Sequence, residues 1–206
     1  MMKINHAVYK VADLDEAVKR YRDDGFDVQY GKADKPYNAL AYFADGSYFE
    51  LLGGIAMPGW ANRLLRLFGK KAFAERISSW QNADEGLIGL ALECETDRFD
   101  ETKKLLKDSG HKYFSFRSKR SEPSGRVLKF AGVMPDEMKI PFFGTCDTDL
   151  KREGFVHPNG VVGYKSISFG TTEELMPLVQ RLCSDDRLHF FVGDGVKDLE
   201  FDYEAS

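Results

Sequence analysis

The sequence predicts an α+β fold made from paired units with the element order β-α-β-β-β. Strand-type and helix-type hydrophobic patterns follow that order over residues 3–53, and the same order recurs over residues 86–147. A third, shorter start follows residue 160 and lacks one strand. A repeated unit of this size can cover the apolar face of its neighbour. We therefore expect two complete units and one incomplete unit in one compact domain.

The first unit opens with a strand over residues 4–11, where apolar and polar residues alternate loosely. Asp13 stands at the N-cap position of the following helix, and Glu16 completes an acidic variant of the capping box. Gly25 is placed to end that helix. The three remaining strands are expected in FDVQYG, NALAYFA and SYFELLG, which are residues 26–31, 38–44 and 47–53.

The second and third units are justified by the same patterns. A strand over 86–95 and a helix over 97–110 precede strands at 112–118, 126–133 and 138–146. The third unit has a strand at 161–170, a capped helix at 171–184, and strands at 188–193 and 199–203. The predicted divisions are a first unit at 1–55, a helical insertion at 56–84, a second unit at 85–150 and an incomplete third unit at 151–206.

The insertion between the first two units is amphipathic. Tryptophan, leucine, phenylalanine and isoleucine recur at helical spacing over residues 58–80, and a helix break is expected at Gly69. Its polar face carries Arg63, Arg66, Lys70, Lys71 and Arg76. The main interpretation is a connecting helix with a solvated basic face. A lid over a pocket and docking to a membrane surface or partner remain alternatives.

A second basic stretch, SFRSKRSEPSGR, covers residues 115–126. Its core at 117–122 is interpreted as a solvated turn between two strands. Contact with an anionic substrate is the alternative.

Composition narrows the classes of function. A net charge of -4 gives no overall attraction to nucleic acid or to an anionic membrane, and no apolar run is long enough to span a bilayer. The three cysteines are far apart and form no CxxC pattern, so neither a disulfide framework nor a zinc knuckle is indicated. Nucleotide-binding glycine motifs and the GxSxG elbow are missing from the sequence. Without an apolar leader segment in the sequence, we expect a cytoplasmic protein.

His6 and Glu50 are the first candidates for chemistry. His6 lies on the first strand of the first unit and Glu50 on its last strand. If those strands are neighbours, both side chains can point into one concavity. Imidazole and carboxylate together suit zinc or a transition ion. An ordinary pair of strand residues is the alternative.

Several stretches resemble the glyoxalase-like branch of the vicinal oxygen chelate superfamily, which includes glyoxalases, bleomycin resistance proteins and dioxygenases. They cover much of residues 3–170, and the most specific are the DLDEAV helix opening after the first strand, DGSYFELL and the HPNG turn. The resemblance implies paired βαβββ modules that form a cupped mixed sheet with outer helices. It also implies a divalent metal in the cup, with zinc, nickel, manganese or iron as candidates, and His6 and Glu50 at two of its ligand positions. Such modules often pair between chains, which makes a homodimer an option.

The second unit departs from that pattern. Its two expected ligand positions hold Gly89 or Leu90 and Phe143 or Gly144, and none of these side chains binds metal. The four-ligand site of glyoxalase I is therefore not expected. His157 is a further candidate ligand, because two histidines and a carboxylate form the iron site of many oxygenases. Its alternative role is on the rim of the HPNG turn.

Asn38 and Tyr48 flank Glu50 on neighbouring strand positions and are candidates for substrate binding. Turn chemistry for Asn38 and core packing for Tyr48 are the alternatives. Two functions follow. One is a metal-dependent lyase, isomerase or dioxygenase acting on a small oxygenated molecule, with Glu50 as a ligand that can also act as base. The other is a metal-free protein that binds or sequesters a small molecule.

Overall fold

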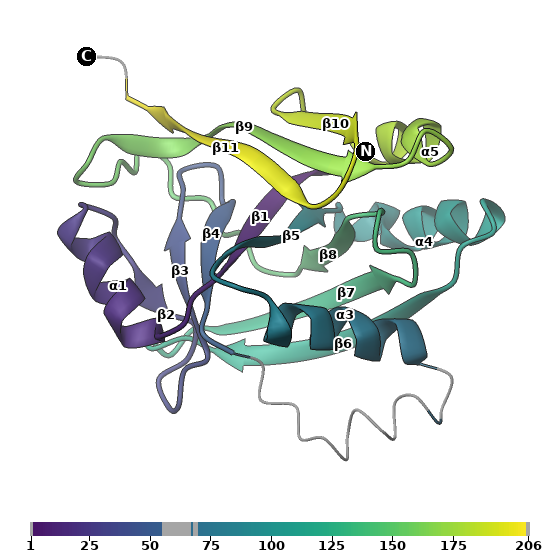
Figure 1. Cartoon of the computed structure of the whole chain (residues 1–206). Helices are drawn as coiled ribbons and strands as arrows, with labels where there is room; N and C mark the ends of the chain where they lie inside the picture. The colour runs from purple at the N-terminus through teal and green to yellow at the C-terminus, as the bar shows by residue number, and fades with distance from the viewer. Residues whose placement is uncertain (1, 55–66, 68–69, 205–206) are drawn as a thin grey trace.

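The structure is a computed structural model that describes residues 2–54, 67 and 70–204 (Figure 1). Its described strands form two sheets, one of eight strands and one of three. The larger sheet has the order β2-β3-β4-β1-β5-β8-β7-β6 and curls into a half-barrel. The predicted α+β class with paired units around a cupped sheet is therefore confirmed.

The first unit supplies one half of the large sheet. Asp13 caps α1, since its side chain accepts a hydrogen bond of 3.0 Å from the backbone N–H of Glu16. Gly25 follows the helix with φ +84, a conformation that costs glycine little. β1 and β4 pair in parallel, so the first and last strands of the unit are neighbours. The elements are β1 (Lys3–Lys10), α1 (Leu14–Asp23), β2 (Gln29–Tyr30), β3 (Asn38–Tyr42) and β4 (Tyr48–Leu52).

The second unit repeats this arrangement in the other half. β5 pairs antiparallel with β1 and parallel with β8, which joins the two units at the centre of the sheet. β6 is longer than expected and runs to Ser121, so the predicted turn at 117–122 is wrong over most of its length. Its nine-residue ladder with β7 holds it as a strand. The elements are β5 (Gly86–Glu93), η1 (Thr96–Arg98), α4 (Phe99–Asp108), β6 (Tyr113–Ser121), β7 (Val127–Pro135) and β8 (Phe142–Cys146).

The third unit forms the smaller sheet, in which β9 lies between β10 and β11. It crosses the convex side of the large sheet (Figure 1), and most of the buried apolar core lies between them. α5 begins at Met176 rather than at 171, because β9 extends to Thr171 and Pro177 suits only a first helical turn. The elements are β9 (Val161–Thr171), α5 (Met176–Leu182), β10 (Leu188–Val192) and β11 (Val196–Tyr203).

The described part of the insertion is α3 (Lys71–Asn82), which buries Ala74, Ile77 and Trp80. Residues 55–66 and 68–69, including the expected break at Gly69, lie outside the described residues. Arg76 was expected on a solvated face, but it is only 4% exposed and donates hydrogen bonds to three backbone carbonyls around β7 and β8. Within the described ranges, no helix is long and apolar enough to cross a membrane.

Candidate functional site

The concave side of the large sheet holds a hollow of about 620 Å³. Side chains alternate along a strand, so β1 directs His6 and Val8 into the hollow while Ala7 packs into the core on the other side. The same alternation places Tyr48, Glu50 and Leu52 of β4 in the hollow. Trp80 and Ile77 of α3 also line it, which makes this helix part of the wall.

His6 and Glu50 meet at one end of this hollow. Parallel pairing puts His6 opposite Tyr48 and Val8 opposite Glu50, so the imidazole and the carboxylate share one face of adjacent strands. His6 Nε2 and Glu50 Oε2 are 3.2 Å apart. Tyr48 stacks on the imidazole, with the ring centroids 4.4 Å apart and the planes at 14°. The neighbourhood predicted for these two residues is therefore present, whereas their role as metal ligands stays a prediction.

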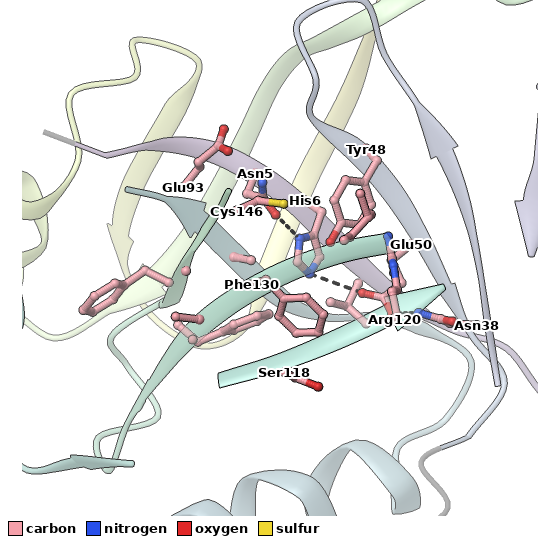
Figure 2. Close-up of a pocket in the computed structure, with 18 of the residues that line it drawn as sticks. Asn5, His6, Asn38, Tyr48, Glu50, Glu93, Ser118, Arg120, Phe130 and Cys146 are labelled. Atoms are coloured by element: carbon pink, nitrogen blue, oxygen red, sulfur yellow. Dashed lines mark hydrogen bonds and ion pairs between the residues drawn. The ribbon is translucent and has the colours of Figure 1, made fainter. Parts of the chain in front are cut away.

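Two amides hold the pair from either side (Figure 2). Asn38 Nδ2 donates to Glu50 Oε1 at 2.7 Å, and Asn5 Oδ1 lies 2.5 Å from His6 Nδ1. Because a carbonyl oxygen only accepts, the Asn5 contact requires a proton on Nδ1. Nε2 of a neutral ring then presents a lone pair to the Glu50 carboxylate. A positive charge between the two atoms, either a proton or a cation, would stabilise this arrangement.

Glu50 is ionised in this environment. Burial alone would raise the pKa of Glu50. Hydrogen bonds from a protonated His6 ring and from Asn38, together with the charges of that ring and of Arg120, outweigh burial, so the pKa lies below its ordinary value. Burial and the adjacent carboxylate hold the pKa of Tyr48 well above its usual range. The hollow thus presents an anionic carboxylate beside a protonated phenol.

Arg120 on β6 brings a cation to the same end of the hollow (Figure 2). Its Nη2 donates to the hydroxyl of Tyr42 at 2.6 Å, and that hydroxyl donates to Glu122 Oε1 at 3.0 Å. Burial tends to lower the pKa of Arg120, but the phenols and carboxylates around it have the larger, opposite effect. The pKa therefore lies above its ordinary value, and the guanidinium is charged. The sequence analysis interpreted residues 117–122, which include Arg120, as a solvated turn, and its alternative was contact of this basic stretch with an anionic substrate.

The second unit has no ligating side chain at the two positions where the resemblance implies a metal ligand. Facing residues on β5 are Gly89, paired with Val8, and Ala91, paired with His6. A Cβ at Gly89 would lie 2.9 Å from Trp80 Cζ2, so the indole fills the space of a side chain there. On β8 the lining residues Phe142, Phe143 and Gly144 carry no ligating group. Cys146 at the end of β8 and Glu93 at the end of β5 also line the hollow and carry a thiol and a carboxylate. Among the described residues, no three His, Cys, Asp or Glu side chains are grouped to hold a metal ion.

His157 does not join the pair and is not among the residues that line the hollow. It is 2% exposed and packs against the rings of Phe26, Phe43 and Phe155. Its Nδ1 accepts a hydrogen bond of 2.9 Å from the backbone N–H of Asp27. The set of two histidines and one carboxylate considered above is therefore not assembled, because the HPNG turn belongs to the packing around β9.

Both the sequence and the fold of this chain are similar to those of known proteins. The sequence matches the model of a family described as Glyoxalase-like domain over residues 4–183. No curated protein sequence matches the chain.

Three solved structures share the fold at low sequence identity. A hypothetical protein from Staphylococcus aureus aligns with TM-score 0.67 and 14% identity, over 96% of this chain and 88% of that one. The Mn(II)-bound glyoxalase from Novosphingobium aromaticivorans aligns with TM-score 0.56 and 13% identity, over 94% and 63%. A catechol 2,3-dioxygenase aligns with TM-score 0.52 and 12% identity, over 98% and 76%. These likenesses concern the fold, whereas the family match covers most of the sequence. The chain belongs to the glyoxalase-like domain family.

Proposed function

We propose that this chain binds a small organic molecule in the hollow without a metal, as a binding or sequestering protein of the glyoxalase-like fold. The lining of the hollow is the observation that carries the proposal. Aromatic and aliphatic side chains from β6, β7, β8 and α3 form much of its walls, and His6, Asn38 and Arg120 lie around Glu50 (Figure 2). Apolar walls with a few convergent polar groups are typical of small-molecule sites.

The polar end can recognise an oxygenated group. Glu50 offers an ionised acceptor that Asn38 holds in place, and Arg120 offers donors. The apolar walls would receive the rest of the ligand, and burial of its surface supplies most of the affinity. The second unit contributes Gly89 and Ala91 where a complete metal site needs further ligands, which favours binding without a metal.

The test uses a neutral apolar dye, N-phenyl-1-naphthylamine, whose fluorescence rises in apolar surroundings. We expect saturable binding at one site. Ser118→Trp would narrow the hollow and lower the affinity for the dye at least about tenfold. Ser115→Trp is the matched control, because Ser115 is exposed on the same strand and does not line the hollow. Equal binding by wild type and Ser118→Trp would contradict the proposal.

A divalent metal held by His6 and Glu50 is the second candidate. The 3.2 Å between Nε2 and Oε2 favours it, since two ligands on one zinc ion are separated by about 2.9–3.4 Å at ordinary bond lengths and angles. Asn5 contacts His6 Nδ1, and Asn38 donates to Glu50 Oε1. Hydrogen bonds of this kind to the atoms that do not face the metal are usual for metal ligands. The pair supplies two coordination positions and leaves the others to water or substrate oxygens. A bound metal would act as a Lewis acid in a lyase, isomerase or dioxygenase reaction.

Metal content separates the two candidates. The metal hypothesis predicts a stoichiometric divalent metal in purified wild-type protein, with loss of that metal in both His6→Ala and Glu50→Ala. His111→Ala is the control, because His111 does not line the hollow. Metal retained in either site variant would contradict this second candidate, and wild-type protein that binds the dye without any stoichiometric metal would favour the first.

A further inference from the structure

Arg120 is a cation that faces the hollow without an acidic partner in the described part of the chain. Of its donors, Nη2 bonds to the Tyr42 hydroxyl, while Nε is buried with no hydrogen-bond partner among the described residues. A guanidinium has five N–H donors, and burying a charge is costly unless an opposite charge meets it. Because Nε is buried, the donors that a ligand could reach are those of Nη1, which has no hydrogen-bond partner among the described residues, and the second N–H of Nη2.

The nearby carboxylates are already engaged elsewhere. Glu122 Oε1 accepts from Tyr42 and Glu122 Oε2 accepts from Arg126 at 2.7 Å. Glu50 Oε1 accepts from Asn38, and Glu50 Oε2 faces His6. No ion pair joins Arg120 to any acidic side chain within the ranges that the structure describes. An anion from outside the chain could meet the charge that these residues leave open.

The rest of the hollow indicates what kind of anion fits. Phe116, Phe130 and Phe142 line its walls, so the body of the ligand is apolar. Lys32 adds one more cation to the lining, and Glu93 adds a carboxyl group whose pKa is raised by burial. The ionised Glu50 lies at the same end, and it would repel a doubly charged phosphate more strongly than a singly charged group. A carboxylate also matches the planar fork of a guanidinium.

We infer that the ligand of this hollow is an organic carboxylate with an aromatic or branched aliphatic body, and that Arg120 binds its carboxylate. This inference rests on the proposed function and adds to it a ligand class and a residue that determines specificity. Tyr42, held by Glu122, orients the guanidinium from behind.

The test compares two probes of nearly equal size, 2-naphthoate and the neutral 2-naphthamide, by isothermal titration at neutral pH. We expect wild-type protein to bind 2-naphthoate at least about tenfold more tightly than 2-naphthamide. Arg120→Gln should abolish this preference, because 2-naphthoate loses the opposite charge that separates it from 2-naphthamide. Arg120→Lys should keep part of the preference, because it retains the charge and loses the fork.

Arg117→Gln is the matched control. It removes the same charge from an exposed residue of the same strand that does not line the hollow, and it should leave the preference intact. Equal binding of both probes to the wild type, or an unchanged preference in Arg120→Gln, would overturn the inference while leaving the proposed function standing. Failure of both probes to bind at about 1 mM would overturn both the inference and the proposed function. Tighter binding of 2-naphthyl phosphate than of 2-naphthoate would overturn the choice of carboxylate.

Discussion

His6 Nε2 and Glu50 Oε2 face each other at 3.2 Å across the parallel strands β1 and β4, although a helix and two strands separate these residues along the chain. The contact depends on strand order, because β1 and β4 become neighbours only when β2 and β3 lie on the far side of β4. It also depends on register, since a slip of one residue would turn either side chain into the core.

Glu50→Gln tests the charge of this pair through the pH dependence of stability. The folded-state pKa of Glu50 lies below its ordinary value of 4.5, so ionised Glu50 stabilises the fold above that pH. This stability is lost as pH falls through the lower folded pKa. We expect Glu50→Gln to lower the free energy of unfolding by about 1 kcal/mol at neutral pH, with the difference from wild type shrinking in acid.

Urea unfolding of both proteins between about pH 7 and pH 3.5 measures this difference. Glu95→Gln is the control, because Glu95 is exposed. A difference that stays constant over the range, or grows in acid, would show that the carboxylate is not stabilised in the folded state.

Gly31→Ala tests how Asn38 is positioned against Glu50. A Cβ at Gly31 would lie 2.1 Å from Asn38 Oδ1, so the amide must move away from its present place. We expect a loss of about 1–3 kcal/mol in the free energy of unfolding and a higher pKa for Glu50, which loses a donor. Urea unfolding measures the first effect and its pH dependence the second.

Gly163→Ala is the matched control for this change, because no atom of the described residues, apart from the glycine's own chain neighbours, lies within 4 Å of a Cβ at that strand position. It should alter stability by less than about 0.5 kcal/mol. In an Asn38→Ala background the clash partner is gone, so Gly31→Ala should then cost less than it does alone. Additive effects of the two changes would argue against the contact.

His157→Asn tests the buried imidazole outside the hollow. Burial lowers the pKa of His157, with an opposing effect from Asp27 and a smaller lowering effect from Arg152. Because the unfolded chain binds a proton more readily, this histidine stabilises the fold above its ordinary pKa of 6.5, and that stability is lost as pH falls. Asn can keep the acceptor for the Asp27 N–H without titrating.

We therefore expect wild-type stability to fall by about 1 kcal/mol more than that of His157→Asn when pH drops from about 7.5 to 5.5. Thermal unfolding across this range measures the difference, with the half-buried His111 changed to Asn as the control. Parallel pH profiles for wild type and His157→Asn would exclude this role.

Much of the fold could be predicted because its signals are local. The capping side chain of Asp13, the glycine after α1 and the repeated β-α-β-β-β order are all visible along the chain, and each reflects backbone chemistry within a few residues. The choice of His6 and Glu50 as neighbours also followed from placing them on the outer strands of one unit.

Arg76, Arg120 and His157 were not predictable in the same way. Each carries polar chemistry that a sequence pattern assigns to solvent or to a turn, and each is placed by partners distant in sequence. Arg76 donates hydrogen bonds to three backbone carbonyls around β7 and β8. Arg120 lies at the hollow because β6 pairs with β7 along its whole length. His157 is enclosed by an aromatic cluster.

The sequence by itself therefore determined which elements form and which unit they belong to, because hydrophobic period and caps act over short distances. Only the tertiary structure decided which polar side chains share the hollow. That outcome depends on sheet order, on register, and on whether a buried charge finds a partner in space.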